Sequence, residues 1–345
     1  MTKVGIAGAT GYAGAELVRL LAGHPEVELT VLTSRQWAGT PIHEIYPAFA
    51  GVVDMVCEIY DPDAMCDRAD IVFTALPHKI PMEIVPALAA RGTRVIDLSA
   101  DFRFSDPAVY ETVYTRHTAG DLAASGVYGL CEVYTEEIRK AGIVGNPGCY
   151  PTSVLLPLAP LLHEKLIDPA TIIADSKSGV SGAGRSPSVA SLYSEISESF
   201  KAYKVASHRH EPEMESVLSR IANDPVDITF VPHLVPMSRG METTIYADLA
   251  GDISDADIHA CLSGYYNGRR FIRLSDSGRP PDTRNVRGTN YCDIAFVVDR
   301  SRRRLILMSV IDNLVKGAAG QAVQNMNIML QIPEHTGLDQ APYPL

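Results

Sequence analysis

The stretch that decides the fold is Gly5-Ile6-Ala7-Gly8-Ala9-Thr10-Gly11-Tyr12-Ala13-Gly14, close to the start of the chain. An apolar strand is expected at residues 3–7 and a helix at residues 14–21, and the stretch joins them. Its last three glycines recur every third residue, a variant of the strict G-x-G-x-x-G pattern. Such a turn brings backbone close to a pyrophosphate and points a helix N-terminus at it. The stretch therefore predicts dinucleotide binding, with a plain tight turn as the alternative.

The first half of the chain continues as alternating apolar strands and helical patterns. We expect strands at residues 27–32, 69–76 and 93–98, and a helix at residues 81–90. Such βαβ alternation is typical of a parallel sheet covered by helices on both faces. The expected class is therefore an α/β Rossmann dinucleotide-binding domain.

The pattern changes after about residue 150. Strands separated by longer loops are expected, and the last two of them flank a turn at residues 299–303 and predict a hairpin; these strands are 172–175, 227–231, 243–248, 271–274, 293–298 and 304–311. We expect an α+β substrate or dimerisation domain with a mixed, largely antiparallel sheet. The expected limits are 1–149 for the NADP-binding domain, completed by the C-terminal helix 313–345, and 150–312 for the catalytic domain.

Composition excludes several classes of protein. The chain has 345 residues, and 41 acidic against 30 basic side chains give it a net charge of −11. A general electrostatic footprint for nucleic acid is absent, and the sequence has no apolar run of the ~20 residues that a membrane span needs. Six scattered cysteines without paired or metal-like spacing indicate a reducing compartment. We expect a cytoplasmic enzyme with no membrane or nucleic-acid partner and no metal.

The end of the second strand distinguishes between two cofactors. An acidic residue there would hold a ribose 2′-hydroxyl, whereas a basic residue accommodates a 2′-phosphate. The strand ends Leu32-Thr33-Ser34-Arg35. Ser34 and Arg35 therefore favour NADP(H) over NAD, although Arg35 is also compatible with an ordinary solvated loop.

Cys149 is the candidate nucleophile. It stands in Asn146-Pro147-Gly148-Cys149-Tyr150-Pro151-Thr152, between a short apolar strand and an apolar helical stretch. The dipole and unpaired N–H groups of a helix N-terminus favour a thiolate over a thiol. We expect the other five cysteines to be inert packing residues.

A cysteine nucleophile needs a proton-transfer partner. The densest candidate segment is Ser207-His208-Arg209-His210-Glu211-Pro212-Glu213. A zinc site is the competing interpretation, but His-x-His without a matching cysteine pair is a weak metal signal. The residues leave the choice between His208 and His210 open.

Three other polar features follow strand ends. The glycine-rich stretch 176–185, with Lys177 and Arg185, is suited to hold a phosphate or carboxylate, or else is a flexible loop. Arg103 and His78 follow two strands of the first domain, where open α/β sheets bind ligands. A plain loop histidine is an equally good interpretation of His78.

Taken together, these motifs resemble the N-acetyl-γ-glutamyl-phosphate reductase family of the acetylated arginine pathway, within the semialdehyde dehydrogenase superfamily. The resemblance runs nearly from end to end of the chain, in order. The matching stretches are 8–14, 76–78, 97–103, 145–152, 178–185, 208–213, 231–236 with 239–240, and 312–322.

The resemblance implies an NADP-dependent aldehyde dehydrogenase that runs reductively on an acyl phosphate, as a homo-oligomer, dimer or tetramer. Cys149 would be the nucleophile and one of His208 and His210 the acid–base group, with His210 preferred. Cofactor contacts are expected from Gly8, Thr10, Gly11, Tyr12, Ala13, Ser34, Arg35, Leu76, Pro77, His78, Ser99, Ser181, Gly182 and Asn313. Substrate contacts are expected from Arg103, Asn146, Ser178, Gly179, Arg185 and Glu213.

Two alternatives stay open at this stage. One is reduction of a related acyl phosphate, either acetyl-aminoadipyl, carrier-linked or aspartyl, since one methylene in a pocket discriminates by only ~1–3 kcal/mol. The other is a nucleotide-binding regulator that keeps the Rossmann fold without chemistry. A single hyper-reactive cysteine protected by substrate would speak against the regulator.

Overall fold

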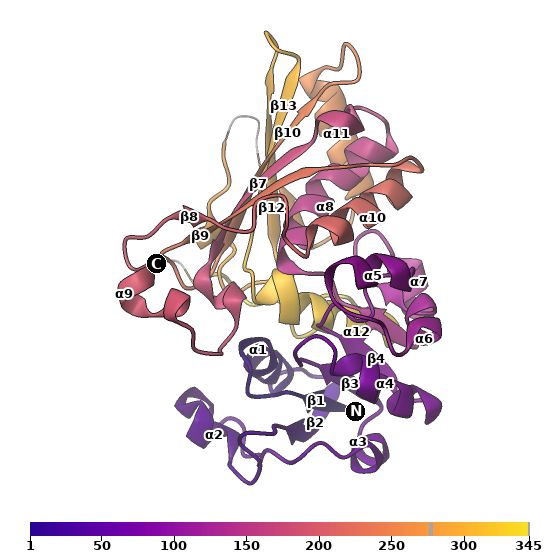
Figure 1. Cartoon of the computed structure of the whole chain (residues 1–345), viewed down its shortest axis with the longest axis vertical. Coiled ribbons are helices and arrows are strands. Elements are labelled where there is room, and N and C mark those ends of the chain that lie inside the picture. The colour runs from indigo at the N-terminus through magenta and orange to yellow at the C-terminus, as the bar shows by residue number, and fades with distance from the viewer. Residues whose placement is uncertain (276–278, 344–345) are drawn as a thin grey trace. The chain divides into compact units, whose positions relative to one another are not determined.

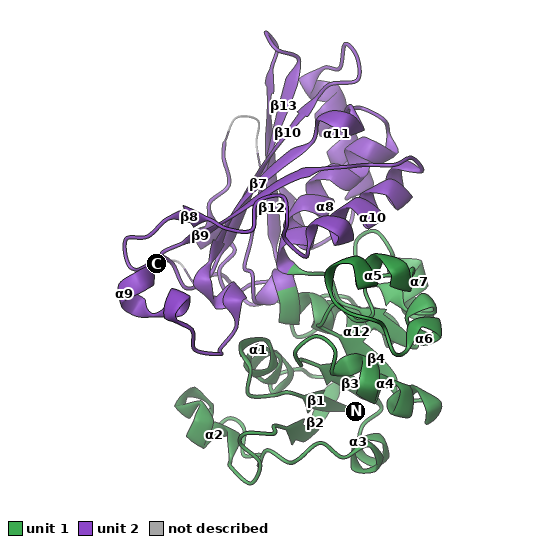
Figure 2. Ribbon diagram, in the orientation of Figure 1, with its two compact units in different colours: residues 1–148, 318–339 green, residues 149–317, 340–345 purple. Residues whose placement is uncertain are grey.

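The computed structural model describes residues 1–275 and 279–343. The chain forms two compact units, which Figure 2 shows in different colours. Unit 1 comprises residues 1–148 and 318–339, and unit 2 comprises residues 149–317 and 340–345. The expected limits of the functional domains stay a prediction, and residues 276–278 and 344–345 within them lie outside the described residues.

Unit 1 is built on a parallel sheet with the strand order β2-β1-β3-β4-β6-β5. Because β1 lies between β2 and β3, the sheet reverses its order there. The carboxyl end of such a switch point is where open α/β sheets bind ligands. The strands are β1 (Thr2–Ala7), β2 (Val27–Thr33), β3 (Ile71–Thr74), β4 (Arg94–Asp97), β5 (Val127–Tyr128) and β6 (Ile143–Gly145).

The helices of unit 1 bury their apolar faces against this sheet. Helix α1 (Tyr12–Leu21) packs on β1 and β2 and also contacts α12 (Gly320–Met329), whereas α3 (Pro62–Arg68) contacts α4 (Pro81–Ala90). The closing helix α12 therefore belongs to the dinucleotide fold although it lies near the other end of the sequence. The remaining elements are α2 (Ile42–Ile45), η1 (Pro47–Phe49), α5 (Pro107–Val113), α6 (Gly120–Ala124) and α7 (Thr135–Lys140).

Unit 2 contains a mixed sheet with the strand order β11-β12-β13-β10-β7-β9-β8. Two pairs, β7 with β9 and β11 with β12, are parallel, and the others are antiparallel. The predicted hairpin is confirmed as β12 and β13. The strands are β7 (Ile173–Gly179), β8 (Lys201–Ala202), β9 (Thr229–Val235), β10 (Met241–Asp248), β11 (Ile272–Leu274), β12 (Cys292–Asp299) and β13 (Arg304–Ile311).

One face of this sheet is covered by helices (Figure 1). Helix α8 (Cys149–His163) packs on β10 and β13, and α10 (Glu211–Ala222) and α11 (Asp255–Tyr265) pack on α8. Alternate residues of β10 are accordingly buried, as period-2 side-chain alternation requires. The short elements are η2 (Pro169–Thr171), η3 (Val180–Ala183), η4 (Val189–Ser191), α9 (Tyr193–Ile196) and η5 (Thr283–Asn285). Both sheets confirm the expected fold class.

The last helix differs from the expectation of one continuous helix from about residue 313. A π-helical turn, η6 (Val315–Ala319), precedes α12. The Asp312 carboxylate accepts hydrogen bonds from the backbone N–H groups of Leu314 (2.8 Å) and Val315 (3.1 Å). The N–H of Gly317 bonds to the Asp312 carbonyl five residues earlier (3.0 Å), which widens the turn.

Candidate functional site

The glycine-rich turn of unit 1 is shaped for a phosphate. Gly8 has φ of +91°, which favours glycine, and a Cβ there would collide with the Ala75 carbonyl oxygen. A Cβ at Gly14 would collide with the Gly8 carbonyl oxygen, so α1 begins close against the turn. Within the described residues, no side chain caps the N-terminus of α1. The backbone N–H groups of Tyr12 and Ala13 therefore start a helix beside an open turn, an arrangement that binds anions.

The ends of β1 and β2 meet at the switch point. The hydroxyl groups of Thr10 and Ser34 share a hydrogen bond of 2.8 Å. The backbone N–H groups of Gly8 and Ala9 both bond to the Thr33 carbonyl. The next residue after Ser34, Arg35, is exposed. The structure thus brings Thr10 and Ser34 together, with an exposed cationic side chain next to them in sequence.

The loop after β3 carries Leu76, Pro77 and His78, and the buried Asp101 carboxylate holds it in place. That carboxylate accepts hydrogen bonds from the N–H groups of Lys79 (3.0 and 2.9 Å) and Met82 (3.1 Å) and from the Tyr110 hydroxyl (2.9 Å). The His78 Nδ1 accepts from the Ala100 N–H (2.9 Å). His78 is therefore an ordered residue at the end of β3, with one ring nitrogen committed to the backbone.

Ser99 forms part of a buried polar network at the end of β4. Its hydroxyl donates to Asp97 Oδ2 (2.6 Å) and accepts from the Asp101 N–H (3.0 Å). Thr74 also donates to Asp97 (2.6 Å). Burial is the largest cause that raises the pKa of the Asp97 carboxyl, to about 6, and the neighbouring Asp101 adds to it. Ser99 thus binds protein atoms here, and its contact with a cofactor stays a prediction.

Arg103 and Asn146 also lie together in unit 1. The Arg103 Nε donates to the Asn146 carbonyl (2.8 Å), and its Nη2 donates to the Leu98 carbonyl (3.0 Å). Gly145 makes this approach possible, because a Cβ there would collide with the Phe102 carbonyl oxygen. The guanidinium therefore ties the loop after β4 to the turn that leads to Cys149. Binding of substrate by either side chain stays a prediction.

Cys149 is the first residue of α8 in unit 2. The helix is almost entirely buried, so its N-terminus is a rigid support for the thiol. Gly317 lies directly against it: a Cβ on Gly317 would be 2.7 Å from the Cys149 Cβ. All six cysteines are reduced thiols.

Both histidines of the His208-Arg209-His210 segment pack beside Tyr150, the residue after Cys149. The two imidazole rings have centroids 4.8 Å apart, and the Tyr150 ring lies 5.3 Å from His208 and 6.0 Å from His210. His210 caps α10, whose first turn carries the buried Glu213. The structure therefore brings both predicted histidines to the start of α8, and Glu213 lies in the first turn of the helix that follows them.

Hydrogen bonding and burial favour the uncharged form of the groups beside Cys149. The His208 Nδ1 accepts the backbone N–H of His210 (3.1 Å), so that nitrogen carries a lone pair. Burial, followed by the positive charges of Lys204 and Arg209, lowers the pKa of His208 to about 4. Tyr150 and Tyr203 share a hydroxyl hydrogen bond of 3.0 Å, and burial raises the pKa of both phenols, that of Tyr203 to about 12. His208 and both tyrosines are therefore neutral at pH 7.

The glycine-rich stretch after β7 is anchored by Asn313. Its Nδ2 donates to the Ser181 hydroxyl (2.9 Å), and its Oδ1 accepts from the Gly240 N–H (2.9 Å). Gly182 faces the same amide, and Gly179 lies so close to the Ser238 carbonyl that a Cβ would come within 2.9 Å. The Ser178 hydroxyl donates to the Gly179 carbonyl (3.0 Å).

These five predicted residues thus lie together in unit 2, whereas Arg185 is exposed farther along the segment.

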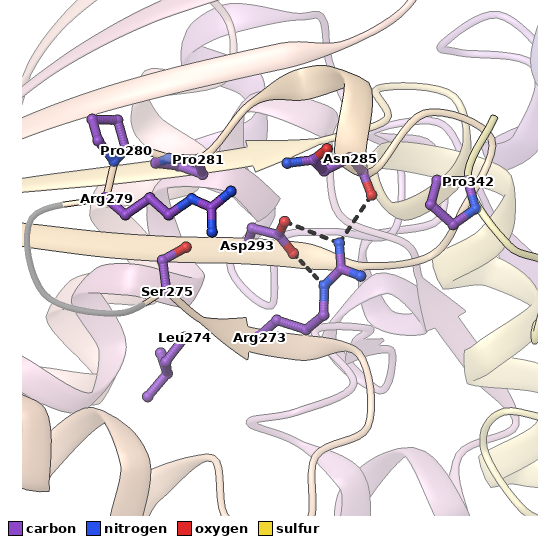
Figure 3. A pocket seen from close by; sticks show the side chains of 9 residues that line it. All are labelled: Arg273, Leu274, Ser275, Arg279, Pro280, Pro281, Asn285, Asp293 and Pro342. Carbon is purple, nitrogen blue, oxygen red and sulfur yellow. Dashed lines mark hydrogen bonds and ion pairs between the residues drawn. The ribbon is translucent and has the colours of Figure 1, made fainter. Parts of the chain in front are cut away.

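Other features bear on the site. A pocket of about 410 Å³ on unit 2 is lined by Arg273, Arg279, Asn285 and Asp293 among others (Figure 3), and it draws on none of the predicted site residues. Arg273 is already paired with Asp293 there (2.6 Å).

In the described residues, no group of three or more His, Cys, Asp or Glu side chains is arranged to hold a metal ion. Over the same residues, no helix is long and apolar enough to cross a membrane.

Sequence reasoning missed several residues that shape the site. Asp101 fixes the His78 loop, Tyr203 pairs with Tyr150, and Gly317 packs on Cys149. Asp101 and Gly317 lie in motifs recognised from the sequence. Tyr203 lies in a segment without a motif, and its pairing depends on the tertiary fold.

Comparisons with known families divide the chain as the fold does. Residues 3–141 match the family model described as "Semialdehyde dehydrogenase, NAD binding domain". Residues 149–313 match "Semialdehyde dehydrogenase, dimerisation domain".

Curated relatives match over the full length. A protein from Desulforapulum autotrophicum named N-acetyl-gamma-glutamyl-phosphate reductase is 54% identical over 342 residues, 99% of each chain. A protein of the same name from Geobacter metallireducens is 53% identical over 343 residues, again 99% of each chain.

Solved structures with the same fold are more distant in sequence. Aspartate semialdehyde dehydrogenase II from Vibrio cholerae, complexed with ASA, has a TM-score of 0.74 at 20% identity, covering 96% of this chain and 98% of that chain. The Candida albicans enzyme with NADP has a TM-score of 0.73 at 18% identity, with the same coverage of 96% and 98%. These likenesses establish the two-domain fold.

Proposed function

This chain belongs to the semialdehyde dehydrogenase family and, within it, to the N-acetyl-γ-glutamyl-phosphate reductases, and on that premise we propose its reaction. It reduces N-acetyl-γ-glutamyl phosphate with NADPH to N-acetyl-L-glutamate 5-semialdehyde and phosphate, a step of arginine biosynthesis. It is an NADP-dependent oxidoreductase that acts on an aldehyde group and forms a thioester on Cys149.

The observation that carries the mechanism is the placement of Cys149. The thiol stands at the N-terminus of a buried helix, beside a cluster that contains His208, His210 and Tyr150. The helix dipole stabilises a thiolate, the reactive form of cysteine. A sulfur nucleophile suits this reaction because the acyl group becomes a reducible thioester and the thiolate is later a good leaving group.

Unit 1 fits NADP(H). The backbone of Gly8, Thr10, Gly11, Tyr12 and Ala13 would hold the pyrophosphate, since no side chain caps the N-terminus of α1 within the described residues. Ser34 and Arg35 would hold the 2′-phosphate by hydrogen bonds and charge. Leu76, Pro77, His78 and Ser99 would line the site from the ends of β3 and β4, with Ser181, Gly182 and Asn313 as further contacts. When bound, NADPH supplies the hydride that reduces the thioester carbonyl.

The protein groups act in two stages. The Cys149 thiolate attacks the acyl-phosphate carbonyl, and the C–O bond to phosphate breaks, giving the thioester and free phosphate. After reduction, the oxygen of the former carbonyl takes a proton, and the thiohemiacetal then loses that proton as the C–S bond breaks. His210 serves as the acid–base group of these proton transfers.

His208 has a different role from His210. Its neutral ring accepts the His210 backbone N–H through Nδ1, so it holds the segment that presents His210. Arg103, Asn146, Ser178, Gly179, Arg185 and Glu213 are the proposed substrate-binding residues. Arg103 and Arg185 are the cations of that set, suited to the phosphate and the α-carboxylate.

Assembly and location complete the proposal. The family model that matches unit 2 is described as a dimerisation domain, and the chain functions as a homo-oligomer, a dimer or a tetramer. Six reduced thiols suit a reducing compartment, so we place the enzyme in the cytoplasm.

The reverse reaction provides the test. The purified chain is assayed for phosphate-dependent oxidation of N-acetylglutamate semialdehyde with NADP and, separately, with NAD. The aminoadipate and aspartate semialdehydes are compared in parallel. Turnover that needs phosphate and prefers the acetylglutamate compound with NADP supports the proposal. Activity on the longer semialdehyde alone would keep the mechanism and assign the chain to lysine synthesis. Absence of turnover on all three would contradict the proposal.

A further inference from the structure

Asn325 of helix α12 reaches the turn that precedes Cys149 in sequence. It is fully buried in unit 1, and its Nδ2 donates to the Gly129 carbonyl (2.9 Å) and to the Asn146 Oδ1 (3.0 Å). Its Oδ1 accepts from the Cys131 thiol (3.2 Å). The amide of Asn325 therefore joins three segments of unit 1, those at residues 129–131, 146 and 325.

These bonds determine which way the Asn146 amide points. The Gly129 carbonyl can only accept a hydrogen bond, so the Asn325 nitrogen must face it. The same nitrogen faces Asn146, which must therefore present its oxygen to it. The Asn146 nitrogen is left to face the Ala318 carbonyl, to which it donates (3.1 Å). Asn325 thus fixes the rotamer of a side chain 179 residues away.

The surrounding backbone is built to allow this contact. A Cβ at Gly129 would lie 2.5 Å from the Asn325 Nδ2, so only glycine admits the amide at that point. On its other side, the Asn146 carbonyl is held by Arg103 Nε (2.8 Å). The turn at residues 145–148 is therefore fixed by hydrogen bonds to both the side chain and the backbone of Asn146.

We propose that Asn325 is a positioning residue for the nucleophile, acting through Asn146 on the turn that sets where Cys149 begins helix α8. This inference rests on the proposed function, in which Cys149 forms the thioester. Only Pro147 and Gly148 separate Asn146 from Cys149, so a rotation of Asn146 is transmitted to the first turn of α8. A displaced thiol loses both its attack geometry and its place at the helix N-terminus.

The test is Asn325→Asp, with Asn327→Asp as the matched control. Aspartate is isosteric but can only accept when ionised, so Asn146 would have to turn its nitrogen toward residue 325 and leave Ala318. Asn327 is a fully buried asparagine on the same helix and bonds to His24 and to the Glu334 and Thr336 carbonyls instead. Both variants bury a carboxylate in the same helix, and at position 327 it faces the His24 imidazole.

Four quantities are measured on the full chain: the melting temperature, kcat, KM and the rate of iodoacetamide alkylation of the Cys149 peptide. Both variants should lower the melting temperature, Asn327→Asp less because its carboxylate can pair with His24. Asn325→Asp alone should lower kcat about tenfold or more, and KM should rise as well because the Asn146 amide is a proposed substrate contact. It should also slow Cys149 alkylation about fivefold.

Alkylation and kcat within twofold of Asn327→Asp would overturn the proposal. If Asn325→Asp does not fold, Asn325→Ser removes the amide without adding charge and should show the same loss of alkylation, whereas an unchanged rate would again overturn it. Alkylation needs no substrate. A wild-type chain that fails to turn over N-acetylglutamate semialdehyde would therefore contradict the proposed function, and the comparison of variants would still decide the role of Asn325.

Discussion

Gly317 packs against Cys149 so closely that a methyl group at position 317 would lie 2.7 Å from the Cys149 Cβ and 3.2 Å from its Cα. Gly317 lies in the π-helical turn η6, which Asp312 organises through its carboxylate and its carbonyl. The crowded atoms are the Cβ and Cα of Cys149, and a change of side-chain rotamer cannot move them away. The π-helical turn therefore sets one boundary of the space that the nucleophile occupies.

Gly317→Ala is expected to displace Cys149 by several tenths of an ångström. Since a misplacement of about 1 Å can cost about 100-fold in rate, this smaller shift should lower kcat by about tenfold. KM for the semialdehyde should change little, because the substrate contacts proposed here do not include Gly317. Steady-state kinetics in the phosphate-dependent direction measure both constants.

The control for this substitution is Gly264→Ala. Gly264 lies in α11, and among the described residues no atom comes within 4 Å of the position that a Cβ would take there. Alanine at this site should stabilise the fold by about 0.5–1 kcal/mol and leave kcat unchanged. Equal kcat in the two variants would refute the role of Gly317.

The two histidines should differ in their effect on the pH profile. His208 is already neutral above pH 5, because its pKa is lowered to about 4. His208→Gln should therefore lower kcat/KM about tenfold through lost positioning, and the pH profile of the rate should keep its shape. His210→Gln removes the proposed acid–base group, so it should change the pH profile and lower kcat by about 100-fold or more. A pH profile lost in His208→Gln and kept in His210→Gln would reverse the two roles.

The unfolding free energy at acid pH should depend on the lowered pKa of His208. Above pH 6.5 the imidazole is neutral in the folded and unfolded chains, so it adds no pH dependence. Between pH 6.5 and about 4 only the unfolded chain binds the proton, and stability falls as the pH falls. The loss is complete below about pH 4 and is on the order of 3 kcal/mol.

Chemical denaturation of wild type and His208→Gln at pH 7 and pH 4.5 measures this contribution. The difference in unfolding free energy between the two pH values should be smaller in the variant. Asp97 acts in the opposite direction, since its raised pKa makes the folded chain bind the proton below about pH 6. Its effect is common to both proteins and cancels. An equal loss in both would show that His208 does not titrate in this way.

The choice of cofactor should depend on Arg35. Arg35→Ala removes a charge-assisted contact to the 2′-phosphate and should raise KM for NADP about tenfold or more, while KM for NAD changes little. Arg91→Ala is the control, an arginine of the same unit that pairs with Asp63 and Asp67. If KM for NADP rises equally in both variants, Arg35 does not bind the 2′-phosphate.

The dinucleotide unit could be predicted because its signals are local. Three glycines at fixed spacing, a strand before them and a helix after them all lie within about twenty residues, and the turn requires glycine for steric reasons that hold in any fold. Cys149 could be recognised for the same reason, since a turn and a following apolar stretch indicate a helix start.

The arrangement of unit 2 could not be predicted to the same depth. Strand β7 is parallel to β9 and antiparallel to β10. The sequence of residues 173–179 does not by itself indicate which strands pair with it. The π-helical turn at Val315–Ala319 depends on Asp312 bonds and on contact with Cys149, so a continuous helix was the natural expectation.

The sequence of one helix does indicate long-range polar contacts. Helix α12 is fully buried although it contains Gln321, Gln324, Asn325 and Asn327. Buried amides need partners, so a helix rich in them indicates polar contacts with distant segments. The identity of those partners, Asn146 among them, follows only from the tertiary structure.

The covalent role of Cys149 is the central claim, and phosphate release in the absence of NADPH tests it most directly. The enzyme is mixed with N-acetyl-γ-glutamyl phosphate alone, and phosphate is measured with time alongside the mass of the Cys149 peptide. We predict a rapid burst of one phosphate per subunit and an N-acetylglutamyl group on Cys149, neither of which occurs in Cys149→Ala. Phosphate release that requires NADPH, with an unmodified Cys149 peptide, would contradict the thioester route.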